Sequence, residues 1–321
     1  MARKISFIIS LFLALNAFFG LLICPAASAG GARAGLLLCS GVIIPSLFPF
    51  IVLGNLFLEM GLPHRVQRLF APVTKKLGIS GAGGVAFFLG IASGYPVGAI
   101  TVAEMYGKGA VKRPEAEWLL GFCDNSGPAF IVSVAGSAVF HSVRVGFFLY
   151  GAHIAAALLT GLILKNGRLE NTDTKLPVPV TDFAGAFTDS VKSATGTMIT
   201  VCGFVVFFSV LVGLLDANGA LSALTGEISY HFRAEPHFAR SLLTGILELG
   251  TGTSSMLGLS VNAKNLALCS FLLGWGGISV HAQATAVIRE GGLNPARHAL
   301  GKLLHGLLSA LITVFTYHVF F

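Results

Sequence analysis

The segment "IASGYPVGA" at residues 91–99 places two glycines, a serine, a proline and a tyrosine inside an apolar run that is long enough to cross a membrane. Glycine weakens a helix and proline removes one of its hydrogen bonds, so backbone polar groups here lose their partners. Irregular backbone at membrane depth is tolerated only where protein buries it or water reaches it. The segment therefore predicts the tip of a re-entrant hairpin that faces an internal site.

The composition is that of a membrane protein. Of the 321 residues, 54% are hydrophobic and 11% are charged, whereas soluble domains average about 25% charged residues. The mean hydropathy is +0.81. Apolar runs close to the length of about 20 residues that crosses a bilayer as a helix recur along the whole chain. They lie near residues 5–23, 35–59, 83–103, 116–139, 145–164, 194–215, 241–260, 265–288 and 303–321. We therefore expect an all-α polytopic membrane protein with the lipid bilayer as its surroundings.

The positions of Lys and Arg decide which runs cross. If all nine runs cross and the N-terminus is cytoplasmic, twelve basic residues lie inside and eight outside, leaving Lys192 uncounted. If runs 83–103 and 241–260 enter and leave on the same side, fifteen lie inside and five outside. The positive-inside rule thus favours seven transmembrane helices plus two re-entrant hairpins in the cytoplasmic membrane, with the N-terminus inside and the C-terminus outside. Because the basic residues occupy short loops and form no stripe, the net charge of +7 does not indicate a nucleic-acid partner.

The second half of the chain resembles the first. Three pairs of segments recur in the same order at an offset of about 155 residues, and Gly90 aligns with Gly245. The pairs are 36–62 with 199–221, 87–99 with 242–255, and 119–132 with 272–285. Each repeat would contain a crossing, a hairpin and two further crossings. Three crossings is an odd number, so the second copy is expected to be inverted relative to the first.

This pattern divides the chain into four parts. We expect an N-terminal transmembrane helix with a short outer loop (1–34), a first repeat (35–164, hairpin 83–106), a cytoplasmic linker (165–182), and a second, inverted repeat (183–321, hairpin 241–260). Apolar residues at helical spacing among basic ones also predict an amphipathic surface helix over residues 65–77. The N-terminus resembles a signal peptide as well, and the sequence leaves its cleavage open.

Polar residues gather where helices are interrupted. The segments "CDNSGPAF" (123–130) and "GWGGISVHAQ" (274–283) carry Gly-Pro and Gly-Gly pairs in mid-run, and unwound helices expose N–H and C=O groups to which transporters bind solutes and ions. Ionisable groups at the bilayer centre cost roughly 2.5–3.5 kcal/mol on insertion scales. The predicted solute-binding residues are Ser93, Tyr95, Asp124, Asn125, Ser126, Glu248, Thr251, Thr253, Ser279, His281 and Gln283. For the small hydroxyls of Ser93, Thr251 and Ser279, structural hydrogen bonding is the stronger interpretation.

Three basic residues share one face of the last segment. His298, Lys302 and His305 stand at i, i+4 and i+7 near its predicted inner end. Two interpretations remain open, a functional role or contact with lipid and water at a cytoplasmic helix end. Glu59 and Glu104 fall at segment edges, where solvated positions explain them.

Other classes of site lack support in the sequence. The five cysteines are scattered singly and form no CxxC pair, which argues against a disulfide framework and a zinc site. We find no nucleophile–base pair, Walker loop or HExxH pattern, so we expect no cofactor, no metal centre and no enzyme.

At five motifs the sequence resembles the YlbJ-like family of sporulation integral membrane proteins. They are "IPSLFPFIVL" (44–53), "SGYPVGA" (93–99), "CDNSGPAFI" (123–131), "GGISVHAQ" (276–283) and "KLLHG" (302–306). One departure is Asp124, where the family pattern has a second Asn. The family falls in the wider Gate, or nucleoside-recognition, group, with concentrative nucleoside transporters and the membrane part of FeoB-type iron transporters. The resemblance implies the same crossing-hairpin-crossing-crossing repeat, and solute binding near Tyr95, Asn125, Glu248 and Ser279.

Two functions from different classes follow. The first is a sporulation-associated transporter or channel for a small polar solute, nucleoside-like or ionic, with a coupling cation. The second is a non-transporting membrane protein that organises partners, sporulation proteins among them, during endospore formation. The sequence leaves open the solute, the coupling ion, the direction of transport and the oligomeric state, a homo-oligomer included.

Overall fold

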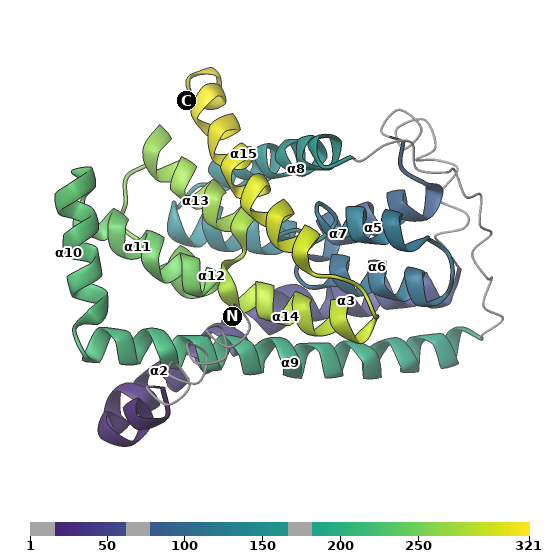
Figure 1. Ribbon diagram of the computed structural model, residues 1–321, viewed down its shortest axis with the longest axis horizontal. Helices are drawn as coiled ribbons and strands as arrows, with labels where there is room; N and C mark the ends of the chain where they lie inside the picture. Colours follow the sequence, from purple (N-terminus) through teal and green to yellow (C-terminus); the bar gives the residue numbers. More distant parts are fainter. Residues whose placement is uncertain (1–16, 62–77, 166–181) are drawn as a thin grey trace, which may run out of the picture.

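The computed structural model describes residues 17–61, 78–165 and 182–321, and over these ranges the protein is built of helices without strands (Figure 1). Five helical stretches in them are long and apolar enough to cross a membrane. They are α2 (Pro25–Leu38), continued by the π-helical turn η1 (Cys39–Ile43) and α3 (Ile44–Glu59); α8 (Val143–Ile163); α9 (Phe183–Ala217); α13 (Ala263–Trp275) with α14 (Gly277–Glu290); and α15 (Ala296–Phe320). The all-α class of the sequence prediction is confirmed.

Both predicted hairpins are pairs of short helices packed on each other. In the first, α5 (Gly81–Ser93) and α6 (Val97–Gly107) are joined by a turn in which Gly94 has φ +90° and the Tyr95–Pro96 peptide is cis. In the second, α11 (Pro236–Leu247) and α12 (Leu249–Ser254) are joined at Glu248, whose backbone is extended. Each of these helices is too short to cross a bilayer alone. The second pair begins before and ends before the predicted range of 241–260, and the re-entrant course of both pairs in the membrane stays a prediction.

The two predicted helix interruptions are also present. After α7 (Arg113–Leu120) the chain leaves helical geometry, and it resumes only with the π-helix η2 (Ala129–Val139). Between α13 and α14, Gly276 and Gly277 have φ of +83° and +78°, left-handed values that glycine adopts without strain. Proline and glycine thus break these segments as expected.

Small residues let the long helices approach closely. Gly31 of α2 packs on α9, where an added Cβ would lie 2.8 Å from Val210 Cα. Gly274 of α13 packs on α15, where a Cβ would lie 2.7 Å from Gly306 Cα. Such contacts are typical of helix packing in membranes, where close backbone approach replaces the hydrophobic effect as the driving force. In Figure 1, α9 runs along one side of the molecule, and α15 runs diagonally between the pair α11–α12 and the pair α5–α6.

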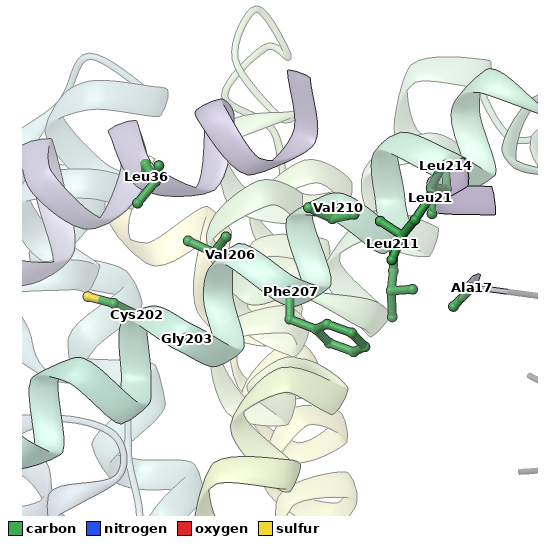
Figure 2. Close-up of a pocket in the computed structure, with 10 residues that line it drawn as sticks. All are labelled: Ala17, Leu21, Leu36, Cys202, Gly203, Val206, Phe207, Val210, Leu211 and Leu214. Atoms are coloured by element: carbon green, nitrogen blue, oxygen red, sulfur yellow. The ribbon is translucent and has the colours of Figure 1, made fainter. Parts of the chain in front are cut away.

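The outer surface is apolar, as lipid contact requires. Large hydrophobic side chains on α8, α9 and α15 are exposed, including Phe147 at 63%, Ile199 at 69% and Phe315 at 79%. An apolar groove of about 450 Å³ also lies on this surface, between residues 17–21, α2 and α9 (Figure 2). Its walls, which include Leu36 and Phe207, carry no candidate site residue. We assign the groove to the lipid-facing surface.

Some predictions fall outside the described ranges or differ from them. The surface helix at 65–77 and residues 166–181 of the linker lie outside, and of the first run only residues 17–23 are described, as helix. The structure adds α10 (Ala220–Phe232) in the stretch between the runs at 194–215 and 241–260. The number of crossings and the inverted repeat stay predictions.

We expect Gly301→Ala to destabilise the fold. A Cβ at Gly301 of α15 would lie 2.5 Å from Gly121 Cα and closer still to Gly121 O, and overpacking of this kind costs about 1–3 kcal/mol. The check is the free energy of unfolding in detergent micelles. The control is Gly196→Ala in α9, where a Cβ meets nothing within 4 Å and alanine is expected to stabilise the helix by about 0.5–1 kcal/mol. Equal effects of the two changes would contradict this packing.

Candidate functional site

Each hairpin tip packs on the helix interruption of its own half of the chain. At the first tip, a Cβ on Gly127 would lie 3.1 Å from Gly94 Cα. At the second, a Cβ on Gly277 would lie 2.9 Å from the backbone nitrogen of Leu249. Only glycine permits both approaches, and Gly94 and Gly277 also have positive φ. The two halves therefore present equivalent junctions of irregular backbone.

Tyr95 connects the two junctions. Its side chain leaves the first tip, and its hydroxyl donates to the main-chain oxygens of Leu273 and Gly274, at 2.9 and 3.3 Å. These carbonyls belong to the last turn of α13, directly before the second interruption. A buried phenol needs such a partner, so this contact holds the four irregular segments in one region.

A small cavity of about 50 Å³ lies where these segments meet. Four predicted site residues line it, Tyr95, Ser126, Glu248 and Gln283. Apolar side chains form the other walls: Ile43, Leu47, Phe130, Val201, Val205, Leu249 and Val280. This is an apolar pocket with a few converging polar groups, the usual composition of a small-molecule site.

Glu248 supplies the carboxylate of the cavity. The side chain is 2% exposed, and one oxygen, Oε2, accepts the Thr251 N–H at 2.5 Å as the N-cap of α12. A helix N-terminus stabilises a negative charge, which offsets part of the cost of burying the carboxylate.

Asp124 belongs to a second, more deeply buried cluster behind the cavity. Its Oδ2 lies 2.9 Å from His298 Nε2, and its Oδ1 accepts the Ala99 N–H at 3.3 Å. Lys302 Nζ donates to the main-chain oxygen of Asp124 at 2.5 Å and lies 3.1 Å from His305 Nδ1. The basic face of α15 thus meets the unwound segment 123–126. The side chains of His298, Lys302 and His305 are fully buried, so the interpretation that this face contacts lipid or water is wrong.

His153 of α8 completes the buried cluster. Its Nε2 accepts the Ser126 N–H at 3.1 Å, and its main-chain oxygen lies 3.0 Å from His305 Nε2. We call Asp124, His153, His298, Lys302 and His305 the charge cluster. Lys302 Nζ also lies 4.7 Å from the centre of the Tyr95 ring, within reach of a cation–π contact. Tyr95 therefore touches both the cavity and the charge cluster.

The remaining predicted site residues lie near the cavity without lining it. Asn125 is buried and donates through Nδ2 to Phe122 O at 2.9 Å, while its Oδ1 has no partner in the described part of the chain. Ser279 accepts from Gln283 Nε2 at 3.2 Å, which agrees with a structural hydroxyl. His281 packs on Trp275 with 4.1 Å between ring centres. Ser93 and Thr253 are buried, and Thr251 takes part through its main-chain N–H.

Sequence reasoning missed His153 and placed Lys302 among loop residues. The signal for His153 was available, because an ionisable residue in the middle of the apolar run at 145–164 is costly unless it is paired. Lys302 lies in the second turn of α15, which begins at Ala296, earlier than the apolar run at 303–321. Without it, fourteen basic residues count as inside and five as outside, so the predicted orientation is unchanged.

Over the three described ranges, no group of three or more His, Cys, Asp or Glu side chains is arranged to hold a metal ion. The cavity and the charge cluster contain hydrogen-bond donors and acceptors together with buried ionisable side chains.

The comparison with protein families gives the class. Residues 41–165, from η1 through the first hairpin and interruption to the end of α8, match the Gate family, described as nucleoside recognition. The fold resembles that of CNTnw, solved in an inward-facing substrate-bound state at TM-score 0.53 and 15% identity, with 98% of this chain and 87% of that chain covered. An outward-facing double variant of CNTnw gives TM-score 0.54 at 14% identity, with 99% and 85% covered. The protein is a polytopic membrane protein in which residues 41–165 match the Gate family model, and its fold resembles that of CNTnw.

Among individual proteins, the chain is 29% identical over 316 residues to the sporulation integral membrane protein YlbJ of Bacillus subtilis (strain 168), covering 90% of this chain and 78% of that protein. The resemblance that the five sequence motifs indicated is thus confirmed.

We expect Lys302→Met to destabilise the protein strongly. The change leaves the Asp124 carboxylate and the unwound carbonyl of Asp124 without the buried cation, and breaking a buried charge pair costs about 3–5 kcal/mol. Reversible unfolding in mixed micelles measures the loss. Lys264→Met is the control, because Lys264 is exposed and lies 4.6 Å over the Phe238 ring, a contact worth about 0.5–1 kcal/mol. Similar losses for both variants would show that the charge cluster does not stabilise the fold.

Proposed function

We propose that the protein transports a small polar solute across the cytoplasmic membrane and binds it in the cavity between the hairpin tips. The observation that carries this proposal is the meeting of two hairpin tips and two helix interruptions around a cavity with four polar side chains. Transporters with discontinuous helices bind their solutes at such junctions. The Gate match and the CNTnw-like fold support the same function.

The lining of the cavity indicates the chemistry of the solute. Glu248 supplies a carboxylate, Gln283 an amide, and Tyr95 and Ser126 hydroxyl groups. A carboxylate accepts hydrogen bonds from hydroxyl or amino groups, and the apolar walls accommodate a flat ring or a short chain. A nucleoside carries both kinds of group, and the matched family is described as nucleoside recognition.

The size of the cavity implies movement during transport. About 50 Å³ holds no more than a few water molecules, whereas pockets for small organic ligands occupy about 300–1,000 Å³. Loading a nucleoside therefore requires the hairpins α5–α6 and α11–α12 to move away from the interruptions on which they pack. Gating of one repeat against the other is the usual form of such movement.

The topology of the sequence analysis is part of this proposal. Six of the proposed crossings lie over described helices, at 35–59, 116–139, 145–164, 194–215, 265–288 and 303–321, with the segment 113–139 composed of α7, the interruption and η2. With the predicted N-terminal helix, the proposed topology has seven crossings, the N-terminus inside and the C-terminus outside. The inverted repeats 35–164 and 183–321 would then present the two hairpins from opposite faces of the membrane.

The similarity to YlbJ supports a role in sporulation. The proposed activity moves a solute and changes no covalent bond, so we assign the protein to transporters and not to enzymes. The solute and a coupling cation are its small-molecule partners, sporulation proteins and a homo-oligomer remain proposed partners, and the bilayer surrounds it.

We expect Glu248→Gln to abolish solute binding while the protein still folds. Glutamine keeps an oxygen that accepts the Thr251 N–H and so preserves the cap of α12, but it removes the negative charge from the cavity. The measurement is the thermal stability of detergent-purified protein against a panel of nucleosides, nucleobases and small polar metabolites. A bound ligand at a hundredfold excess over its Kd stabilises the wild type by about 2.7 kcal/mol.

The control is Glu227→Gln on α10, where the carboxylate is 72% exposed and pairs with His231. This variant is expected to respond to the same compounds as the wild type. Ligand-induced increases in thermal stability of equal size in Glu248→Gln and the wild type would rule out the proposed cavity as the binding site. Asn125→Ala, which removes a buried amide beside the cavity, is expected to weaken binding without abolishing it.

A further inference from the structure

The charge cluster holds more ionisable groups than helix packing requires. All five residues of the charge cluster are fully buried: Asp124, His153, His298, Lys302 and His305. Replacing a buried polar network by apolar side chains is often neutral or stabilising, so such a network is weak support for a purely structural role. A carboxylate, an ammonium group and three imidazoles within one contact network suit the storage of a proton.

The hydrogen bonds assign the protons of two of the histidines. With Lys302 taken as an ammonium group, which only donates, His305 Nδ1 is assigned as the acceptor and His305 Nε2–H as the donor to His153 O. His153 Nε2 accepts from the Ser126 N–H, so this ring carries its proton on Nδ1. In this assignment neither ring accepts a further proton without breaking a hydrogen bond, so both are treated as neutral.

His298 differs from the other two. Its Nε2 donates to the Asp124 carboxylate at 2.9 Å, so its unprotonated nitrogen is Nδ1, which is buried and has no hydrogen-bond partner in the described ranges. In His153 the nitrogen without a partner, Nδ1, already carries the proton. This nitrogen is the one position in the charge cluster where a proton adds without breaking a contact. The imidazolium formed would lie directly against a carboxylate. With Asp124 negative and Lys302 positive, the cluster then alternates between net charge 0 and +1.

A route for the proton leads through His281. This residue is partly exposed, while its Nε2 is buried and has no partner among the residues that the structure describes. The His281 and His298 rings are 5.4 Å apart between centres and nearly perpendicular, at 77°. On this route a proton on His281 would pass to His298 Nδ1, and the reverse transfer would return it. Atoms and charge balance with one proton taken up and one given back.

Other titratable groups face the charge cluster from neighbouring elements. The hairpin tip contributes Tyr95, whose hydroxyl is bound to the carbonyls of α13. Around the charge cluster, α7 carries Glu115, which accepts the Ser80 N–H, while Cys123 and Cys269 lie in the apolar cores. None of these takes the proton position next to Asp124.

The charge cluster and the solute cavity share one stretch of backbone. Residue 124 binds His298 and Lys302, and Ser126, two residues later, lines the cavity while its N–H binds His153. The Tyr95 ring faces Lys302 and also lines the cavity. A change of charge at His298 therefore acts on the cavity through groups that touch both sites.

We propose that the Asp124–His298 pair is a proton-binding site and that the proton it exchanges is the coupling ion of transport, an inference that rests on the proposed transport function. His281 is the relay between this pair and water.

The proton site is tested without any solute by ¹⁵N NMR of histidine-labelled protein in nanodiscs between pH 5 and 9. The His298 signal, assigned by its loss in His298→Gln, is expected to change from neutral imidazole to imidazolium within this range. In Asp124→Asn the charged form should appear only at lower pH, because the carboxylate that stabilises it is gone. His231, paired with Glu227 on the exposed α10, is the internal control and should titrate equally in both proteins. A His298 ring that keeps one charge state throughout would overturn the proton site.

Coupling is tested in proteoliposomes with radiolabelled uridine as the probe. An imposed pH gradient is expected to raise uridine accumulation in the wild type and in His231→Gln, and to have no effect in His298→Gln. Glutamine still donates to Asp124, so folding is expected to survive, and size-exclusion chromatography checks this. Uridine exchange without any response to the gradient would overturn proton coupling and leave transport standing. Absence of uridine exchange would contradict transport of this nucleoside, and the NMR titration would still decide the proton site.

Discussion

The structure depends on how one interrupted helix satisfies its free backbone and its carboxylate inside an apolar protein. In hydrocarbon, an unpaired carbonyl and a buried charge each cost several kcal/mol. Lys302 Nζ binds the free carbonyl of Asp124, and His298 binds its carboxylate. A single face of α15 therefore supplies the partners of both the carbonyl and the carboxylate. This explains why three basic residues stand at i, i+4 and i+7 in a buried helix.

Once this segment is held open, the rest of the site follows. Gly127 receives the first hairpin tip at Gly94, and Tyr95 reaches from that tip to the carbonyls at the end of α13. The second tip packs in the same way on Gly277. The cavity is therefore surrounded by backbone that can change its hydrogen bonds, which continuous helices cannot do, and the charge cluster lies directly behind it.

The sequence predicts the fold well where apolar composition and helix-breaking Gly and Pro residues determine it. Apolar length predicts the helices, and the Gly and Pro residues of 94–96, 127–128 and 276–277 predict the first tip and both interruptions. It also predicts that Asp124 and Glu248 need partners, because buried ions are costly. It cannot predict those partners, since the contact of Asp124 with His298 joins residues 174 apart and depends on tertiary packing. The helix α10 was missed because its sequence lacks a long apolar run.

The most direct test of the central claim is a double-mutant cycle with Asp124→Asn and Lys302→Met, read as the free energy of unfolding in mixed micelles. If both residues belong to one buried charge network, removing both charges costs less than the sum of the single changes, by about 1 kcal/mol or more. Losses that add to within about 0.5 kcal/mol would show that the two groups are independent, and would contradict the central role of the contact between the open segment and α15.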